Sequence, residues 1–176
     1  MTDGGPTTTR MKHQLRAVGL DFVEHAPLRF VFGTDVGAPP AEVFAAISAD
    51  PSTWTAWFPG FRDGGYEGPT PYGVGTRRWV RVGRGGYYET MMAWDAPNRW
   101  TYRVDESDAR VANALVEEWT ISRQPGGGSL VTWTFAVDPS PVLRLTGPLG
   151  SVVIGSLFRR AMRNLDRRIR SPTTPS

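Results

Sequence analysis

The amino-acid sequence predicts an α+β protein in which a curved antiparallel sheet of seven strands is closed by one long C-terminal helix. Between Leu28 and Arg170, one strand precedes two short helices, six further strands separated by Gly/Pro turns, and a long amphipathic segment. Large aromatic residues alternate along the strands, as Trp133 and Phe135 do. Because such a sheet has a wide inner face, we expect it to enclose a pocket for a small apolar molecule rather than a solid core.

The first strand and the two short helices are expected before residue 61. Residues 28–36 alternate in part between apolar and polar, which is typical of a strand. Gly37-Ala38-Pro39-Pro40 predicts a helix start, since proline is tolerated in a first helical turn. Asp50-Pro51 ends this helix and predicts the cap of a second one. The large aromatic residues of that second helix are Trp54, Trp57 and Phe58.

Gly- or Pro-containing turns separate the remaining strands. The strand-like runs between these turns cover residues 75–82, 87–94, 99–105, 113–122 and 130–137. Residues 61–68 are a weaker candidate for an edge strand.

The C-terminal helix has the clearest pattern. At ~100° per residue, five apolar residues fall within an arc of roughly 80°: Ile154, Phe158, Met162, Leu165 and Ile169. Four arginines point the other way: Arg159, Arg163, Arg167 and Arg170. We therefore expect one face to pack on the sheet and the other to meet water. Pro148 either starts this helix or kinks a longer one begun at Ser140-Pro141.

The predicted domain spans residues 28–170. Residues 1–27 are expected to be an N-terminal appendage with a short helix that Gly19 ends, and residues 171–176 a disordered tail. The chain has no apolar run of the ~18 residues that a membrane span needs, no apolar secretory segment at its start, and no cysteine. These features favour a cytoplasmic protein.

Composition narrows the chemistry of the domain. The two histidines, His13 and His25, and the single lysine, Lys12, all precede the first strand. The domain therefore lacks the histidine that a Ser-His-Asp triad or a histidine-bound zinc site needs, and the lysine that a Schiff base needs. We expect no metal and no cofactor. We also expect no nucleic-acid partner, since the pI near 9.7 reflects a net charge of only +3.

Strand periodicity assigns side chains of the last two strands to the inner face of the sheet. Trp133 and Phe135 belong to the apolar set of the final strand. In the strand before it, Glu117 lies between the inward-facing residues Leu115 and Trp119. A carboxyl group in this position has to be paired with a cation or protonated, because burying an isolated charge is costly.

The register of the earlier strands depends on one hairpin. If Trp94 lies opposite Arg99 across the turn at residues 95–98, a second set of residues faces inward: Tyr87, Glu89, Met91 and Ala93. The same parity turns Arg78 inward on the preceding strand. The inner face then carries three ionisable groups, and a one-residue bulge would change the assignment.

Several segments, in this order, resemble the SRPBCC superfamily: Ala38-Pro39-Pro40-Ala41-Glu42-Val43-Phe44, Trp54…Trp57-Phe58-Pro59, Gly73-Val74-Gly75-Thr76, Trp94-Asp95-Ala96-Pro97-Asn98-Arg99 and Gly127-Gly128-Ser129-Leu130-Val131-Thr132-Trp133. This superfamily includes START lipid-transfer domains, pollen-allergen-like ligand carriers and polyketide cyclase/dehydrase-like proteins. The resemblance covers residues 28–170 and is nearest to the bacterial polyketide cyclase/dehydrase-like branch. It implies a helix-grip fold with an apolar cavity between sheet and C-terminal helix, but no particular reaction.

We therefore interpret the chain as a protein that binds a small hydrophobic or aromatic ligand, polyketide- or lipid-like, in an internal cavity. The expected volume is in the range of ~300–1,000 Å³. The aromatic residues of the second short helix are expected to cover the cavity mouth. The expected ligand-binding residues are Trp54, Trp57, Phe58, Arg78, Met91, Trp100, Tyr102, Glu117, Trp119, Trp133, Phe135, Phe158 and Met162.

Three alternative functions stand beside this interpretation. As a cyclase, aromatase or dehydratase, the protein would use Glu117 or Glu89 for proton transfer together with Tyr102. As a lipid or quinone carrier, it would meet an anionic membrane surface through the arginine face of the last helix. As an interaction module, it would present an apolar patch on the outer face of the sheet, formed by Trp79, Tyr88, Met92 and Trp94.

Overall fold

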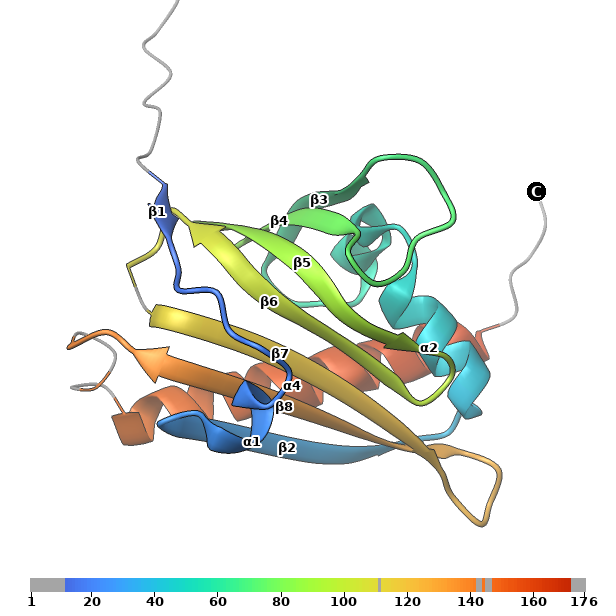
Figure 1. Ribbon diagram of the computed structural model, residues 1–176. Coiled ribbons are helices and arrows are strands. Elements are labelled where there is room, and N and C mark those ends of the chain that lie inside the picture. Colours follow the sequence, from blue (N-terminus) through green and yellow to red (C-terminus); the bar gives the residue numbers. More distant parts are fainter. Residues whose placement is uncertain (1–11, 111, 142–143, 145–146, 172–176) are drawn as a thin grey trace, which may run out of the picture.

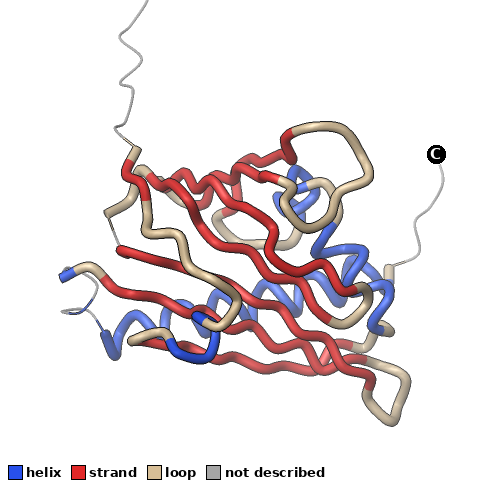
Figure 2. Tube along the Cα trace, viewed as in Figure 1, coloured by secondary structure: helices blue, strands red, loops and turns tan. Residues whose placement is uncertain are grey.

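A curved antiparallel sheet wraps around the long C-terminal helix α4 (Gly147–Arg170), which crosses one face of the sheet (Figures 1 and 2). The structure is a computed structural model that describes residues 12–110, 112–141, 144 and 147–171. Seven strands follow one another in the order β2-β8-β7-β6-β5-β4-β3, and a short additional strand, β1, pairs with β6. The predicted α+β architecture, a sheet closed by a long helix, is confirmed.

The strands lie close to their predicted ranges. The first is β2 (Leu28–Val36), and the others are β3 (Phe61–Glu67), β4 (Arg77–Val82), β5 (Gly85–Asp95), β6 (Arg99–Ser107), β7 (Ala112–Arg123) and β8 (Ser129–Pro139). The weak candidate at residues 61–68 is therefore a strand, and it forms the sheet edge beside β4.

Two short helices follow β2, as predicted: α2 (Pro40–Ser48) and the 3₁₀-helix η1 (Pro51–Ala56). Proline lies in the first turn of both, and the Asp50 side chain caps η1 by accepting a hydrogen bond from the Ser52 N–H (2.9 Å). The Asn164 side chain of α4 donates to the Trp57 carbonyl (3.0 Å). This bond fixes the end of η1 against the C-terminal helix.

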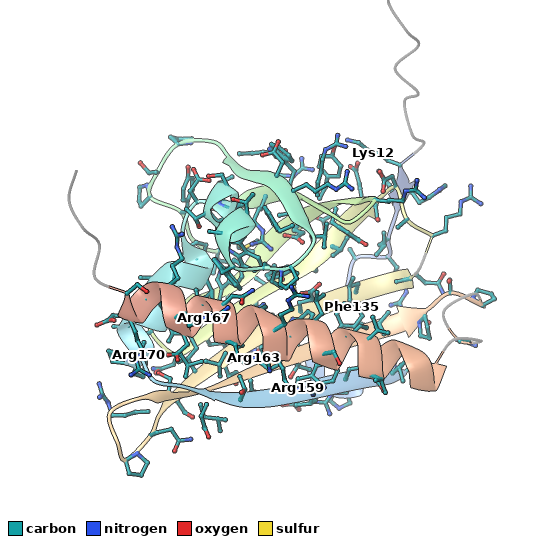
Figure 3. The ribbon with its side chains drawn as sticks, turned by 180° about the vertical axis from the view of Figure 1, so that it is seen from behind. Lys12, Phe135, Arg159, Arg163, Arg167 and Arg170 are labelled. Carbon is teal, nitrogen blue, oxygen red and sulfur yellow. The ribbon has the colours of Figure 1, made fainter. Side chains whose placement is uncertain are left out.

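Helix α4 packs one face on the sheet and exposes the other, as its sequence predicts. Phe158, Met162 and Leu165 are buried, and the exposed surface carries the four expected arginines, Arg159, Arg163, Arg167 and Arg170 (Figure 3). The structure describes this helix from Gly147 onwards, a range that includes Pro148. The alternative of a longer helix begun at residues 140–141 involves residues 142, 143, 145 and 146, which lie outside the described ones. None of the helices described combines the length and the apolar character that crossing a bilayer requires.

The N-terminal residues differ from the prediction. His13–Gln14 is not helical but forms β1. The single turn α1 (Phe22–His25) then lies on the outer face of the sheet, opposite α4 (Figure 1). There it packs Phe22 and Val23 on an apolar group of sheet residues, Ala114, Val116 and Ala136. Covering these side chains removes an apolar patch from water, which explains why the segment adheres to the domain. The predicted tail lies outside the described residues from 172 onwards.

The strand register differs from the prediction at one point. An irregularity in the pairing of β5 with β6, just before Ala93, places Trp94 opposite Trp100 rather than Arg99. Trp94 therefore turns inward and contacts Phe44, with ring centroids 6.3 Å apart. Ala93, expected to face inward, takes the other face because consecutive strand residues alternate.

Trp57→Ala is expected to lower the free energy of unfolding by about 3–5 kcal/mol, the range for truncating a buried large aromatic side chain. Trp57 is 2% exposed, and its ring centroid lies 4.5 Å from that of Trp54. Urea unfolding measures the loss. Val74→Ala, at a position that is 69% exposed, is the control and should stay within about 0.5 kcal/mol of the wild type. Similar small losses in both variants would contradict a core position for Trp57.

Candidate functional site

A partly enclosed cavity of about 230 Å³ lies between the inner face of the sheet and α4. Strands β3 to β8, the region of η1, and Ile154 and Leu157 of α4 supply its walls. Glu89, one of the expected catalytic residues, borders it. So do seven of the expected ligand-binding residues: Trp54, Phe58, Arg78, Tyr102, Glu117, Trp133 and Phe135.

The cavity is smaller than expected because the other end of the inner face is a packed aromatic core. Six of the expected ligand-binding residues lie in this core, are no more than 2% exposed and do not border the cavity: Trp57, Met91, Trp100, Trp119, Phe158 and Met162. Trp133 forms the boundary. Its ring stacks on Trp119 with centroids 5.3 Å apart, and the same residue also borders the cavity.

Trp54 belongs to this core as well as to the cavity wall. It is 3% exposed, and its indole N–H donates to the Ile47 carbonyl (3.1 Å). Its ring packs against those of Phe61, Trp100 and Trp119, with centroids about 6 Å apart. Trp54 was expected only to cover the cavity mouth, but it is also part of the main core.

Seven cavity residues were not among those expected from the sequence: Phe61, Val80, Val82, Tyr87, Leu115, Ile154 and Leu157. Strand periodicity predicts that most of these strand residues face inward, so the sequence does contain a signal for them. Leu157 is different, because at ~100° per residue it lies about 60° beyond the apolar arc of the last helix. The cavity thus lies at one edge of that arc, next to Ile154.

Glu117 is the polar centre of the cavity wall. Its Oε2 accepts a hydrogen bond from the Tyr102 hydroxyl (2.7 Å) and another from the Trp133 indole N–H (3.0 Å). The Tyr102 oxygen in turn accepts a long hydrogen bond from Trp119 Nε1 (3.4 Å). Tyr102 lies directly opposite Glu117 in the pairing of β6 with β7, so the sheet register itself brings the two groups together. Within the part of the chain that the structure describes, Oε1 has no hydrogen-bond donor.

Arg78 is paired with Glu89 and not with Glu117. The two residues lie directly opposite each other on β4 and β5, and Arg78 Nε donates to Glu89 Oε2 at 2.6 Å. Their side chains are 1% and 4% exposed. The guanidinium also lies over the rings of Trp54, Trp100 and Tyr102, at 4.5–5.1 Å from their centroids.

One donor of Arg78 is left over. Its Nη1 is buried and has no hydrogen-bond acceptor among the described residues. The Tyr66 hydroxyl donates to the Ser48 carbonyl (3.0 Å), and the nearby guanidinium opposes the rise that burial causes in the pKa of this tyrosine. A buried donor without an acceptor is uncommon in folded proteins.

The charges at the site leave Glu117 as the group that titrates near neutral pH. Burial raises the pKa of Glu117 to about 7 and the charge of Glu89 adds to this rise, although the hydrogen bond from Tyr102 and the charge of Arg78 oppose it. Burial also raises the pKa of Glu89, and the charge and the hydrogen bond of Arg78 at 2.6 Å oppose that rise. Burial holds the pKa of Tyr102 well above its usual range, so its hydroxyl stays a donor.

The expected outer patch is not a continuous exposed surface. Trp94 faces the inner side, and Met92 packs against the apolar group beneath α1. Lys12 covers Tyr88, with its ammonium 3.5 Å from the ring centroid. Among the described residues, no group of three or more His, Cys, Asp or Glu side chains is arranged to hold a metal ion.

Comparisons with known proteins show similarity in sequence and in fold. Residues 27–170 match the family model described as polyketide cyclase/dehydrase and lipid transport. Uncharacterised proteins of Mycobacterium bovis and Mycobacterium tuberculosis are 34% identical over 156 residues, which cover 85% of this chain and 89% of theirs.

Solved structures share the fold. A START superfamily protein from Mycobacterium smegmatis superimposes with a TM-score of 0.66 at 14% identity, covering 82% of this chain and 99% of that one. Major latex-like protein 151 from Panax ginseng gives 0.66 at 14% identity, covering 82% and 98%. A protein from Thermobifida fusca gives 0.63 at 22% identity, covering 80% and 92%. The expected helix-grip fold is confirmed.

Removing the Glu117 carboxyl is expected to change how stability depends on pH. The folded pKa of about 7 lies above the ordinary glutamate value of 4.5, so the folded state binds this proton more tightly than the unfolded state. That contribution is fully present below pH 4.5 and is lost as pH rises through 7, by on the order of 3 kcal/mol. Urea unfolding of the wild type and of Glu117→Gln should show the variant gaining stability relative to the wild type over this interval. A constant difference would contradict the raised pKa.

Proposed function

The chain belongs to the polyketide cyclase/dehydrase and lipid transport family, and we propose that it binds one small, neutral, largely apolar molecule carrying a hydroxyl or carbonyl group. The family and the fold support a ligand-binding role in general. A cavity of about 150 Å³ binds benzene, so a cavity of about 230 Å³ suits a ligand of one or two rings. The observation that carries the proposal is the Glu117 carboxyl on the wall of this cavity.

Glu117 offers either half of a hydrogen bond. Tyr102 and Trp133 occupy Oε2, which leaves Oε1 for a ligand. With a pKa of about 7, the carboxyl donates to a carbonyl oxygen when protonated and accepts from a hydroxyl when ionised. The two ligand classes would therefore bind best on opposite sides of neutral pH.

Arg78 supports a neutral ligand rather than an anion. Its side chain borders the cavity, but Glu89 already balances its charge. When Glu117 is ionised, the three groups carry a net charge of −1. A carboxylate ligand would therefore meet repulsion in a desolvated space, and we expect the site to reject it.

At pH 8, Glu117→Gln is expected to weaken binding of 2-naphthol about 10- to 100-fold, since a hydrogen bond to a charged group contributes about 1.5–3 kcal/mol. Binding of naphthalene, which lacks the hydroxyl, should not change. Quenching of tryptophan fluorescence reports both, because Trp54 and Trp133 border the cavity.

The matched control is Glu118→Gln. This neighbouring carboxylate lies on the other face of β7, where it pairs with Arg99. It should leave the affinity for both probes unchanged. Unaltered 2-naphthol binding in Glu117→Gln, or equal losses for 2-naphthol and naphthalene, would refute the role of the carboxyl. Native mass spectrometry of the purified protein then identifies a co-purifying molecule.

The neutral pKa of Glu117 favours proton transfer as a second candidate function. General acid–base groups work best when their pKa lies near the operating pH. The ionised carboxyl would remove a proton from the carbon next to a ligand carbonyl, and the positive charge of Arg78, which borders the cavity, would stabilise the enolate oxygen that results. Glu89, the other carboxyl considered for this role, is bound to Arg78.

Hydrogen–deuterium exchange tests this candidate without knowledge of the natural substrate. The protein should accelerate exchange at the carbon between the ring and carbonyl of 2-tetralone in D₂O, with a rate that rises through pH 7 and is lost in Glu117→Gln. NMR follows the reaction. If the protein does not accelerate the exchange over its rate in buffer, the catalytic function is contradicted and ligand binding alone remains as the proposed function.

We also propose that the exposed face of α4 binds an anionic membrane. The exposed face of α4 carries the four arginines named above, and Val152 and Val153 near its start are 63% and 67% exposed. Basic residues beside exposed apolar ones suit the surface of such a membrane.

Vesicle sedimentation tests the membrane contact. The protein should bind vesicles that contain phosphatidylglycerol, should not bind pure phosphatidylcholine, and should dissociate at high salt. Arg159→Glu with Arg163→Glu should abolish binding, whereas Arg123→Glu, an exposed arginine outside α4, should not. Equal binding to both vesicle types would contradict an electrostatic contact.

A further inference from the structure

A segment outside the family match crosses the sheet at the cavity end. We name residues 12–26 the N-terminal strap; the residues that match the family begin at 27. The strap runs over the outer face, from β1 beside the end of β6 to α1 in front of β7 and β8 (Figure 1). Lys12 at its start lies toward the same end of the molecule as Phe135 of the cavity wall (Figure 3).

The strap joins two strands where they diverge. The pairing of β6 with β7 runs as far as Arg103 opposite Val116. Beyond that point β1 takes the place of β7, with His13–Gln14 paired to β6. The Leu15 N–H then donates to the Asp105 carbonyl (2.8 Å), and the Arg16 N–H donates across to the Asn113 carbonyl of β7 (2.7 Å).

Leu15 packs into the layer that ends the cavity. It contacts the cluster formed by buried Val104, Leu115 and Val137. Tyr102 on β6 and Phe135 on β8 border the cavity. The next inward-facing residue is Val104 on β6 and Val137 on β8. Leu115 belongs to both groups, because it borders the cavity and also lies in the cluster. Leu15 therefore packs against a layer that contains a residue of the cavity wall.

We propose that the strap sets the length of the cavity, and that Leu15 is a specificity-determining residue that limits how long a ligand fits. This inference rests on the proposed ligand-binding function. Leu15 does not border the cavity; it acts as a positioning residue by supporting Leu115 from behind. Without the Leu15 side chain, Leu115 has room to retreat toward the gap between β6 and β7, and the cavity lengthens toward the strap.

The other contacts of the strap do not support the layer that ends the cavity. Arg16 pairs with Asp138 (3.2 Å) and Lys12 with Glu106 (3.8 Å), and the basic side chains are 58% and 47% exposed. Exposed ion pairs of this kind contribute little. Phe22 and Val23 pack further along, on the outer face of β7 and β8. Leu15 is thus the strap residue that supports the end layer.

The test compares 4-ethylphenol with 4-hexylphenol, in the full-length protein, by tryptophan fluorescence. Each methylene group newly accommodated changes affinity about fourfold. Leu15→Ala should therefore raise the ratio of 4-hexylphenol to 4-ethylphenol affinity about 15-fold, as two more methylene groups become buried. Leu15→Val, a smaller truncation, should raise this affinity ratio about fourfold. This variant tests the proposal if Leu15→Ala does not fold.

Leu20→Ala is the matched control. Leu20 lies on the same strap, is 37% exposed and is not part of the end layer, so the ratio should not change. An unchanged ratio in Leu15→Ala and Leu15→Val, or an equal loss for both phenols, would overturn the role of Leu15 while leaving the ligand-binding function intact. Failure of the wild type to bind either phenol would instead overturn the proposed function and this inference with it.

Discussion

The interior of this protein is organised around one buried ion pair, between Arg78 on β4 and Glu89 on β5. A guanidinium that is 1% exposed needs a charged partner, and the register of the two strands places Glu89 directly opposite. Removing either partner would leave an uncompensated buried charge, which costs far more than the pair contributes to stability. The faces of Trp54, Trp100 and Tyr102 complete its surroundings. The packed core and the cavity meet at this cation.

The same pair explains the chemistry of Glu117. From the sequence, two states of this carboxyl are open: ionised by pairing with Arg78, or unpaired with a raised pKa. The sheet order decides between them, because β5 lies next to β4 whereas β7 lies two strands further on. Arg78 is engaged by the nearer carboxylate. Glu117 is therefore held by the neutral donors of Tyr102 and Trp133, which leave its pKa near 7.

The fold could be predicted from the sequence largely because glycine and proline turns mark the strand ends and alternation marks the inner face. Alternation does not tell how far along a strand a side chain lies, so Trp119 and Glu117 appear equivalent although one is core and the other cavity wall. The irregularity before Ala93 has no local signal, and it moves Trp94 to the inner face. The pairing of β1 with β6 joins residues more than 90 positions apart, which no local pattern encodes.

Strand β7 connects the outer surface of the sheet to the cavity. Its residues alternate between Ala114 and Val116, which lie beneath α1, and Leu115 and Glu117, which border the cavity. The strap also binds this strand through the Asn113 carbonyl. The stretch that carries the polar anchor is thus held from outside by the strap and from inside by Tyr102 and Trp133. Because interiors are close-packed, a shift of β7 at the strap moves the position of Glu117 as well as that of Leu115. The length of the cavity and the placement of its carboxyl are therefore set together, by a segment that precedes the residues matched by the family.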